Sequence, residues 1–149
     1  MIKICKNSGP NNSLFRSYIL KDPNSLIYSD PSFLKMISNH LKADFFWLIA
    51  QEGRKILGLM PFLKKNGPLG PVFNSLAYYG SNGGVIQVVE NVEAKISLIK
   101  KFYEQAHIES ALSATIITNP IKRDAEAYEN NIKYDFRDER IGQITHFSK

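Results

Sequence analysis

The chain has 149 residues, of which 44% are hydrophobic and 22% are charged, so its length and composition are those of one soluble globular domain. It contains no apolar run of the roughly 20 residues that span a bilayer, and its N-terminus lacks the apolar segment of a signal peptide. These features exclude a membrane span and predict a cytoplasmic location. The lone Cys5 excludes an internal disulfide and has no neighbouring metal ligand, so we expect a small, buried apolar side chain there.

The formal net charge of +5 can attract anionic ligands, but the positive charges are dispersed. Lysines occur in pairs, such as Lys64–Lys65 and Lys100–Lys101, and these pairs are typical of a solvated surface. No basic stripe with interleaved aromatic residues is present in the sequence, which argues against nucleic acid as a partner.

The first predicted elements are a helix and a hairpin. Residues 1–12 are polar and expected to be poorly ordered, apart from "IKIC". Asp30 is a good N-cap and Pro31 suits the first helical position, which predicts a helix over residues 31–41. Residues 44–65 then form two β-prone runs around Glu52-Gly53-Arg54, the pattern of a hairpin.

Proline and glycine shape the next segment. We expect Pro61 to bend or end the second strand of the hairpin, and residues 66–71 to form an irregular loop. "VFNSLAYYG", residues 72–80, is predicted as a third strand that enters a glycine-rich loop.

The clearest helix is predicted over residues 91–109, with apolar side chains at helical spacing: Val92, Ile96, Ile99, Tyr103 and Ala106. A strand over residues 111–119 and a short helix after Pro120 follow. Ala125, Tyr128 and Ile132 are expected to face inward from that helix. Residues 133–148 are expected to add one or two short strands.

The order of these elements predicts a single α/β (α+β) domain over residues 1–149. A strand, a long helix and another strand imply a right-handed crossover within a mixed central sheet flanked by helices.

This order, with a glycine-rich turn before the main helix, resembles the fold of GNAT N-acyltransferases. Four segments resemble the FemAB-like branch, which includes aminoacyltransferases that build peptidoglycan cross-bridges. They are "IYSDPSFLKMI", "GRKILGLMPFLKKNGPLGPVFNSL", "YYGSNGGVI" and "YDFRDERIGQITHFS", and the resemblance extends over residues 24–147.

The chain departs from this family in two ways. FemAB-like proteins usually contain two GNAT-like halves, and this chain resembles the first half only. The Arg/Gln-x-x-Gly-x-Gly/Ala motif, which usually binds acetyl-CoA where the main helix begins, is missing. The resemblance therefore supports the fold more strongly than it supports an acetyl-CoA site.

The glycine-rich loop is the candidate binding segment. Backbone N–H groups before a helix N-terminus can bind a pyrophosphate or a carboxylate, and glycine permits close approach. The candidate ligand-contacting residues are Gly80, Ser81, Asn82, Gly83 and Gly84. The alternative is a tight turn in which glycine serves backbone geometry alone, and "VIQVVE" can form a strand that separates the loop from the helix.

The catalytic residues are not identified by the sequence. Tyr79, beside the glycine-rich loop, and His146, in the last predicted strand, are weak candidates. His40 and His107 are more typical of helix ends and surfaces, and Trp47 of a core. No nucleophile–base pair and no metal-ligand spacing is present in the sequence.

Two hypotheses for function follow. In the first, the chain transfers an acyl or aminoacyl group from acetyl-CoA or another donor to an amine of an amino sugar, a nucleotide-linked sugar or a cell-envelope precursor. In the second, it is a non-catalytic half-GNAT module that pairs with itself or with a GNAT-like second subunit.

Overall fold

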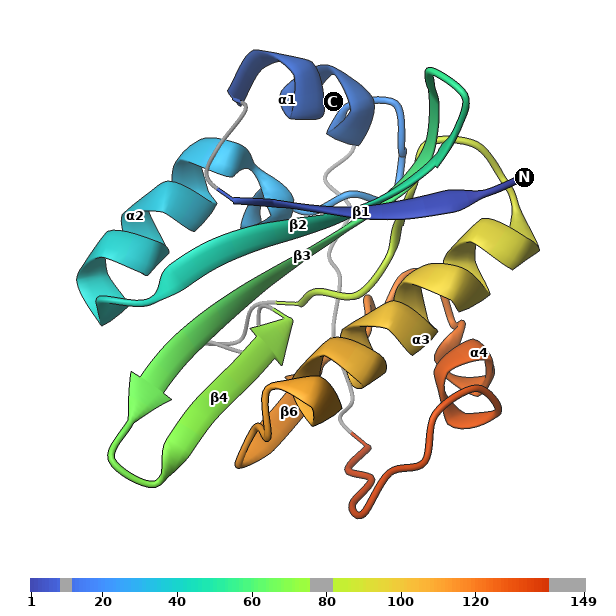
Figure 1. Ribbon diagram of the computed structural model, residues 1–149. Helices are drawn as coiled ribbons and strands as arrows, with labels where there is room; N and C mark the ends of the chain where they lie inside the picture. The colour runs from blue at the N-terminus through green and yellow to red at the C-terminus, as the bar shows by residue number, and fades with distance from the viewer. Residues whose placement is uncertain (9–11, 76–81, 140–149) are drawn as a thin grey trace.

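The structure is a computed structural model that describes residues 1–8, 12–75 and 82–139. Its elements run from the N-terminus through a strand, three helical segments, a three-stranded meander, a two-residue strand and a long helix to a final strand and helix (Figure 1). In chain order they are β1 (Lys3–Ser8), α1 (Asn12–Ile19), η1 (Ile27–Ser29), α2 (Pro31–Leu41), β2 (Asp44–Glu52), β3 (Lys55–Gly67), β4 (Gly70–Ser75), β5 (Ile86–Gln87), α3 (Val92–Ile108), β6 (Ser113–Ile116) and α4 (Ala125–Glu129).

The strands form one mixed sheet in the order β1-β2-β3-β4-β6, and β5 pairs with β3. The pairs from β1 to β4 are antiparallel, whereas β4 and β6 are parallel and are connected through α3. The predicted fold class, a mixed central sheet flanked by helices, is confirmed.

The β2–β3 hairpin is confirmed, and Gly53 in its turn has φ +58°, a conformation that glycine adopts without strain. Of the expectation that Pro61 bends or ends the second strand, the end is wrong, because Pro61 lies inside β3, opposite Trp47, and β3 ends at Gly67. The described pairs of β3 with β4 start at Leu63, and those with β5 involve residues 58 and 59. No described pair on that side of β3 involves Pro61, and a position without such pairing tolerates proline.

The expectation of an irregular loop over residues 66–71 is also wrong. Gly67 and Gly70 face each other across a tight turn that joins β3 directly to β4. Gly70 has φ +136°, which explains why a glycine occupies this turn. The predicted third strand is β4 up to Ser75, and its remaining residues lie outside the described part.

The N-terminus is more ordered than the sequence predicts. Residues 3–8 form β1, an edge strand paired antiparallel with β2, and α1 follows without having been anticipated. Polar residues suit this strand because most of its side chains are exposed at the sheet edge. Cys5, expected to be buried, is half-buried there.

The two longer helices are confirmed. α2 begins at Pro31, and the Asp30 carboxylate accepts a hydrogen bond of 2.8 Å from the Ser32 N–H. α3 is capped by Asn91, but its buried face is rotated from the predicted stripe: Val92 is 67% exposed and Tyr103 is 38% exposed. The buried residues are Ala94, Lys95, Leu98, Ile99, Phe102 and Ala106.

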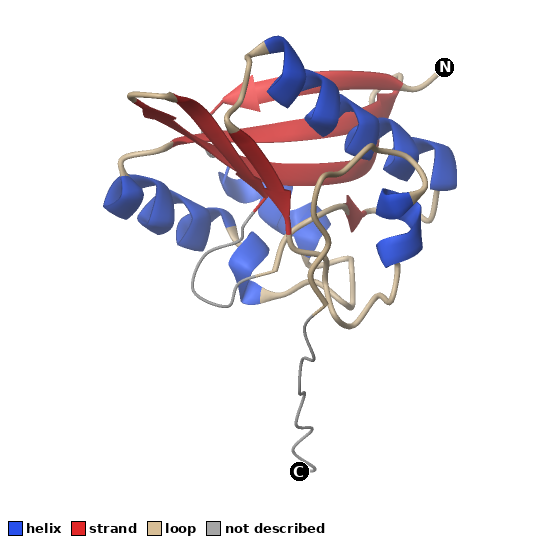
Figure 2. Ribbon diagram, turned by 90° about the horizontal axis from the view of Figure 1, so that it is seen from below, coloured by secondary structure: helices blue, strands red, loops and turns tan. Residues whose placement is uncertain are grey.

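Two hydrophobic clusters lie on opposite faces of the sheet, and helices cover both faces (Figure 2). On one face α1 and α2 pack over a cluster that includes Phe15, Leu34, Trp47 and Leu59. On the other face α3 and α4 pack over a cluster that includes Phe62, Phe73, Leu98, Phe102 and Tyr128. The prediction of Trp47 as a core residue is confirmed.

The C-terminal region is only partly described. Tyr128 in α4 is buried as predicted, and Ile132 packs partly against the same cluster. Residues 133–139 form no strand, so the expected terminal strands are not found there. The rest of that prediction, including His146, lies outside the described residues.

Candidate active site

The parallel pair β4 and β6 defines the place in this sheet where a ligand site is expected. Ligands of sheets with parallel strands generally bind beyond the carboxyl ends of those strands. These ends are Ser75 in β4 and Ile116 in β6, which are partners in the register. The segment from Asn82 to Val85 returns to these two strand ends. We call the group Ser75, Gly83, Gly84, Val85, Ile117 and Tyr128 the strand-end site.

Gly83 lies in close contact with the end of β4. Its N–H donates a hydrogen bond of 2.7 Å to the carbonyl of Ile117. A Cβ atom placed on Gly83 would lie 2.0 Å from the Ser75 carbonyl oxygen, a separation that no side chain allows. The glycine is therefore required because the backbone of the chain itself passes here.

Gly84 is a second position where a side chain would not fit. Its φ is +83°, and a Cβ atom would lie 2.5 Å from the Tyr128 hydroxyl oxygen. Its N–H donates to Ser75 Oγ at 2.9 Å, and that hydroxyl in turn donates to the Pro61 carbonyl at 3.0 Å. At Gly83 and Gly84 the close approach is thus to the protein itself. Asn82 is half-buried, and Tyr79, Gly80 and Ser81 lie outside the described residues.

Tyr128 connects α4 to this segment. Its hydroxyl accepts a hydrogen bond of 2.8 Å from the Val85 N–H, and its side chain is 6% exposed. Burial raises the pKa of the Tyr128 phenol above its usual value, and the negative charge of Asp124 raises that pKa further. The hydrogen bond from Val85 lowers the pKa but is the smaller effect. The phenol is therefore protonated at every physiological pH.

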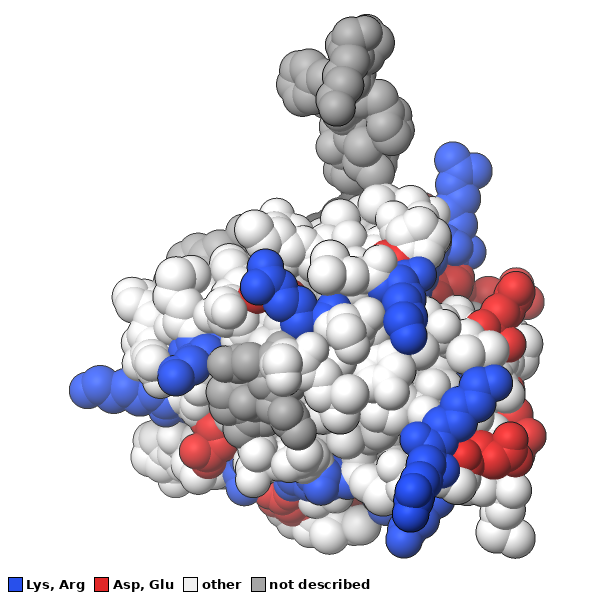
Figure 3. Space-filling view, turned by 90° about the horizontal axis from the view of Figure 1, so that it is seen from above, with Lys and Arg blue, Asp and Glu red and all other residues white. Residues whose placement is uncertain are grey.

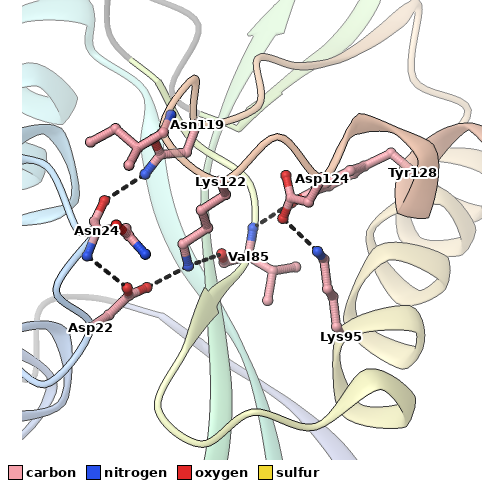
Figure 4. A network of polar contacts seen from close by, with 9 residues as sticks. Asp22, Asn24, Val85, Lys95, Asn119, Lys122, Asp124 and Tyr128 are labelled. Atoms are coloured by element: carbon pink, nitrogen blue, oxygen red, sulfur yellow. Dashed lines mark hydrogen bonds and ion pairs between the residues drawn. The ribbon is translucent and has the colours of Figure 1, made fainter. Parts of the chain in front are cut away.

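Two ion pairs flank the strand-end site (Figure 4). Lys95 of α3 contacts Asp124 at 2.5 Å, and Lys122 contacts the buried Asp22 at 2.5 Å. The Lys122 ammonium also lies 3.4 Å from the Val85 carbonyl oxygen, to which it donates. These contacts tie together segments that are far apart in the sequence.

The network continues through Asn24 and Asn119. The Asn24 N–H donates to Asp22 Oδ1 at 3.0 Å, and the Asn119 side-chain amide donates to the Asn24 carbonyl at 2.6 Å. The Asp124 carboxylate differs from the Asp22 carboxylate in one respect. Asp124 Oδ1 is buried and has no hydrogen-bond partner among the described residues. Within the described ranges it is the one buried side-chain oxygen without a hydrogen-bond partner.

The N-terminus of α3 does not have the features of an anion site. The Asn91 side chain already accepts from the Ala94 N–H at 2.8 Å. Glu90 and Glu93 lie exposed on either side of this cap, and their negative charges oppose a bound pyrophosphate. The described residues at this helix end therefore do not suit the phosphates of coenzyme A.

The other candidate residues lie apart from the strand-end site. His40 lies in the last turn of α2 and His107 in the last turn of α3, and both are exposed. The His107 ring stacks on Tyr103 at a centroid distance of 6.4 Å. No group of three or more His, Cys, Asp or Glu residues in the described ranges could hold a metal ion. On the face shown in Figure 3, Lys and Arg side chains are scattered among acidic and uncharged ones.

The sequence identified part of this site. The inward pattern of the short helix predicted a buried Tyr128, but nothing in the pattern indicated its contact with Val85. The pairs Lys95–Asp124 and Lys122–Asp22 carried no sequence signal, since their members are 29 and 100 positions apart.

Two solved structures share this fold over almost their whole length. One is described as a probable acetyltransferase, with a TM-score of 0.57 and 15% identity over 97% of this chain and 99% of that chain. The other is a ribosomal-protein-alanine N-acetyltransferase from Brucella melitensis biovar Abortus 2308, with a TM-score of 0.58 and 12% identity over 97% of this chain and 100% of that chain. No protein-family model and no curated protein sequence matches the chain.

These likenesses establish the fold. The chain has the mixed α/β architecture of GNAT acetyltransferases, as its sequence resemblance implied. In the described residues, no helix is long and apolar enough to cross a membrane.

Proposed function

We propose that this chain is a GNAT-fold N-acyltransferase that modifies a primary amine. The observation that carries the proposal is the fold: both similar structures are named as acetyltransferases, and the likeness spans nearly all of each chain. The similarity of four segments to FemAB-like proteins suggests the acceptor, an amino sugar, a nucleotide-linked sugar or a cell-envelope precursor.

Acyl transfer to an amine needs two proton-handling groups. One accepts the proton that the amine loses as its nitrogen bonds to the acyl carbon, and the other protonates the leaving group as its bond to that carbon breaks. Beside the strand-end site, Asp124 Oδ1 is a buried acceptor without a hydrogen-bond partner in the described residues. Tyr128 is a neutral phenol, because burial and the charge of Asp124 raise its pKa, so its O–H is a donor. We therefore propose these two residues as the acid–base candidates.

The first experiment is a thermal-shift titration with acetyl-CoA, coenzyme A and a panel of nucleotide-linked amino sugars. A ligand at 100 times its Kd is expected to add about 2.7 kcal/mol to the free energy of unfolding. Pantetheine, which lacks the nucleotide and its phosphates, is the control for the anionic part of coenzyme A. No stabilisation by any donor or acceptor would contradict the proposal.

Transfer itself is then measured as formation of the acylated amine by mass spectrometry. We expect Asp124→Asn to lower kcat without a matching rise in KM, because the variant loses the proton acceptor. Glu126→Gln is the matched control, since Glu126 lies in α4 two residues after Asp124 and accepts an exposed hydrogen bond from the Asn130 side chain. Equal rates for Asp124→Asn and wild type would remove Asp124 from the proposal.

A second candidate function is a non-catalytic module that pairs with itself or with a GNAT-like second subunit. It is favoured by the strand-end site, where the segment Asn82–Val85 occupies the hydrogen-bonding groups of Ile117 and Ser75. The carboxylates of Glu90 and Glu93 beside the N-terminus of α3 also favour it, because their negative charges oppose the phosphates of coenzyme A. A protein that binds no acyl donor but forms a stable complex would support this second function.

A further inference from the structure

The position just beyond the ends of β4 and β6 is occupied by the chain itself. Ser75 and Ile116 are the last residues of these two parallel strands. Gly83 lies between the strand ends: its N–H donates to the Ile117 carbonyl at 2.7 Å, and a Cβ atom on it would lie 2.0 Å from the Ser75 carbonyl oxygen. This is where a ligand of parallel strands is expected. We call Gly83 and Gly84 the inserted glycines.

The inserted glycines stand outside the ladder that β3 forms with its neighbours. β2 pairs with one side of β3, and both β4 and β5 pair antiparallel with the other side. β4 pairs with β3 from Leu63 onward, and β5 pairs with residues 58 and 59. β5 therefore follows the line of β4 along β3, and the inserted glycines belong to neither strand. Their departure would leave these strand pairs intact.

The contacts that keep the inserted glycines in place are few and polar. Among the described residues, the Gly83 N–H donates to the Ile117 carbonyl, and the Gly84 N–H donates to Ser75 Oγ at 2.9 Å. Neither glycine has a side chain, so no apolar side chain of this pair is exposed when it leaves. Glycine also adopts positive and negative φ with similar ease, which lets the backbone change direction here.

Val85, the next residue, is anchored. Its side chain is 4% exposed, and its N–H donates to the Tyr128 hydroxyl at 2.8 Å. Its carbonyl accepts from Lys122 at 3.4 Å, and Lys122 is paired with the buried Asp22 (Figure 4). β5 begins directly afterwards at Ile86. The boundary between a weakly held and a firmly held backbone thus falls between Gly84 and Val85.

We propose that the inserted glycines are an internal block of the strand-end site, which opens while Val85 stays anchored. In the closed state, the chain itself uses the Ile117 carbonyl and the Ser75 hydroxyl, so a ligand reaches these groups only in the open state. The apparent affinity for that ligand is then reduced by the fraction of molecules that are open. The nature of the ligand, an acyl donor, rests on the proposed function, whereas the opening is a property of the ligand-free chain.

The first test is native-state hydrogen exchange of the full chain, followed by NMR in increasing urea below the unfolding transition. The reference amides are those of Leu48 and Ile49 in β2, which has paired strands on both sides. We expect the Gly83 and Gly84 amides to exchange at least about a hundredfold faster than the reference amides, through a local opening. Their rates should depend little on urea, because the opening exposes little surface. Exchange with the same rate and urea dependence as Leu48 would overturn the proposal.

Ser75→Ala tests the hydrogen bond that holds Gly84. The variant removes the acceptor, so we expect exchange at Gly83 and Gly84 to rise about tenfold relative to Leu48, the effect of one lost hydrogen bond. Ser38→Ala is the matched control, because the Ser38 hydroxyl likewise donates to a backbone carbonyl, that of Ala43 at 2.6 Å in a separate part of the fold. A rise of equal size in both variants would count against the proposal. The ratio to Leu48 removes any change in global stability.

Acetyl-CoA is the probe for displacement. If it raises the Tm and also speeds exchange at Gly83 and Gly84, the ligand has replaced the inserted glycines, which supports the proposal. If it raises the Tm and leaves this exchange unchanged, the ligand binds without displacing them, which overturns the proposal but not the proposed function. If neither acetyl-CoA nor another donor or acceptor raises the Tm, the proposed function fails, and the urea dependence in the ligand-free chain still decides whether the block opens.

Discussion

At the scale of single residues, the glycines before α3 are explained by contacts within the protein. Gly83 contacts Ser75 and Ile117, and Gly84 contacts Ser75 and Tyr128. A glycine-rich segment was a candidate ligand loop, because glycine allows any group to approach the backbone. At these two positions the approaching group belongs to β4 or α4.

Gly83→Ala is therefore predicted to destabilise the fold. The added Cβ would lie 2.0 Å from the Ser75 carbonyl oxygen. The strand or the loop must then shift, which we expect to lower the free energy of unfolding by about 2–3 kcal/mol. Thermal denaturation measures this as a fall in Tm. Gly67→Ala is the control, because its Cβ would meet nothing closer than 3.4 Å and should change stability by less than about 1 kcal/mol. Equal effects of the two substitutions would contradict the packing explanation.

Tyr128→Phe tests the hydrogen bond that holds Val85. The variant leaves the buried Val85 N–H without its acceptor, so we expect a loss of about 1–3 kcal/mol in chemical denaturation. Tyr103→Phe is the matched control, since Tyr103 is 38% exposed and its substitution should lower the free energy of unfolding only slightly. A stability equal to wild type would mean that water or another group replaces the phenol.

At the scale of elements, the C-terminus of α3 is held to the sheet by Glu109. Its carboxylate contacts Lys6 of β1 at 3.1 Å and Lys64 of β3 at 2.5 Å, and it also accepts from Gln105. Burial of Glu109 raises its pKa, but the hydrogen bonds from Lys64, Gln105 and Lys6 together outweigh burial and lower the pKa from 4.5 to about 2. One carboxylate thus joins the helix to two strands.

This shift predicts how stability depends on pH. Because the pKa of Glu109 is lower in the folded chain than in the unfolded chain, its contribution is fully present above about pH 4.5 and is lost as the pH falls towards 2. Glu109→Gln should therefore be less stable than wild type at pH 6, and the difference should shrink between pH 4.5 and 2. Urea denaturation across this pH range measures the difference in the free energy of unfolding. Glu104→Gln is the control, because the pair that Glu104 forms with Lys101 is exposed. A difference that stays constant with pH would contradict the assignment.

The elements also show where local patterns mislead. Pro61 suggested a bend or an end of the strand, yet β3 continues through it, and no described pair with β4 or β5 involves Pro61. The stripe predicted for α3 began at Val92, whereas the buried face begins at Ala94 and includes Lys95. A lysine was not expected in a buried stripe, and it lies there because Asp124 is opposite.

At the scale of the whole molecule, one sheet separates two hydrophobic clusters. Trp47, the only tryptophan, lies in the cluster under α1 and α2, between Phe15 at 4.9 Å and Phe45 at 5.3 Å. α3 covers the opposite cluster. Because β2 and β3 contribute side chains to both clusters, neither cluster can form alone.

We therefore predict that the described fold unfolds as one cooperative unit. Trp47 fluorescence and far-UV circular dichroism should give the same midpoint in denaturant. Leu98→Ala, in the cluster under α3, should lower both midpoints equally, by about 2–4 kcal/mol of unfolding free energy. A fluorescence midpoint that stays unchanged in this variant would show that the two faces unfold separately.

The sequence predicted the parts of the fold that depend on neighbours along the chain. Asp30 and Pro31 fixed the start of α2, Asn91 marked the start of α3, and Gly53 marked the β2–β3 turn. α1 was missed although Phe15 and Ile19, four residues apart, form its buried face. β1 was mostly missed because edge strands tolerate polar residues. For the candidate site, the sequence predicted the glycine-rich segment but not the residues that this segment contacts.

The sequence by itself thus determined the fold class, the central hairpin and the two longer helices, because caps, turns and apolar runs act over a few residues. Only the tertiary structure decided what the glycines contact, which face of α3 is buried and which charges are paired. Ser75, Gly84 and Tyr128 meet because β4, the returning segment and α4 converge at one end of the sheet. Such contacts depend on positions in space, which the local pattern of residues does not encode.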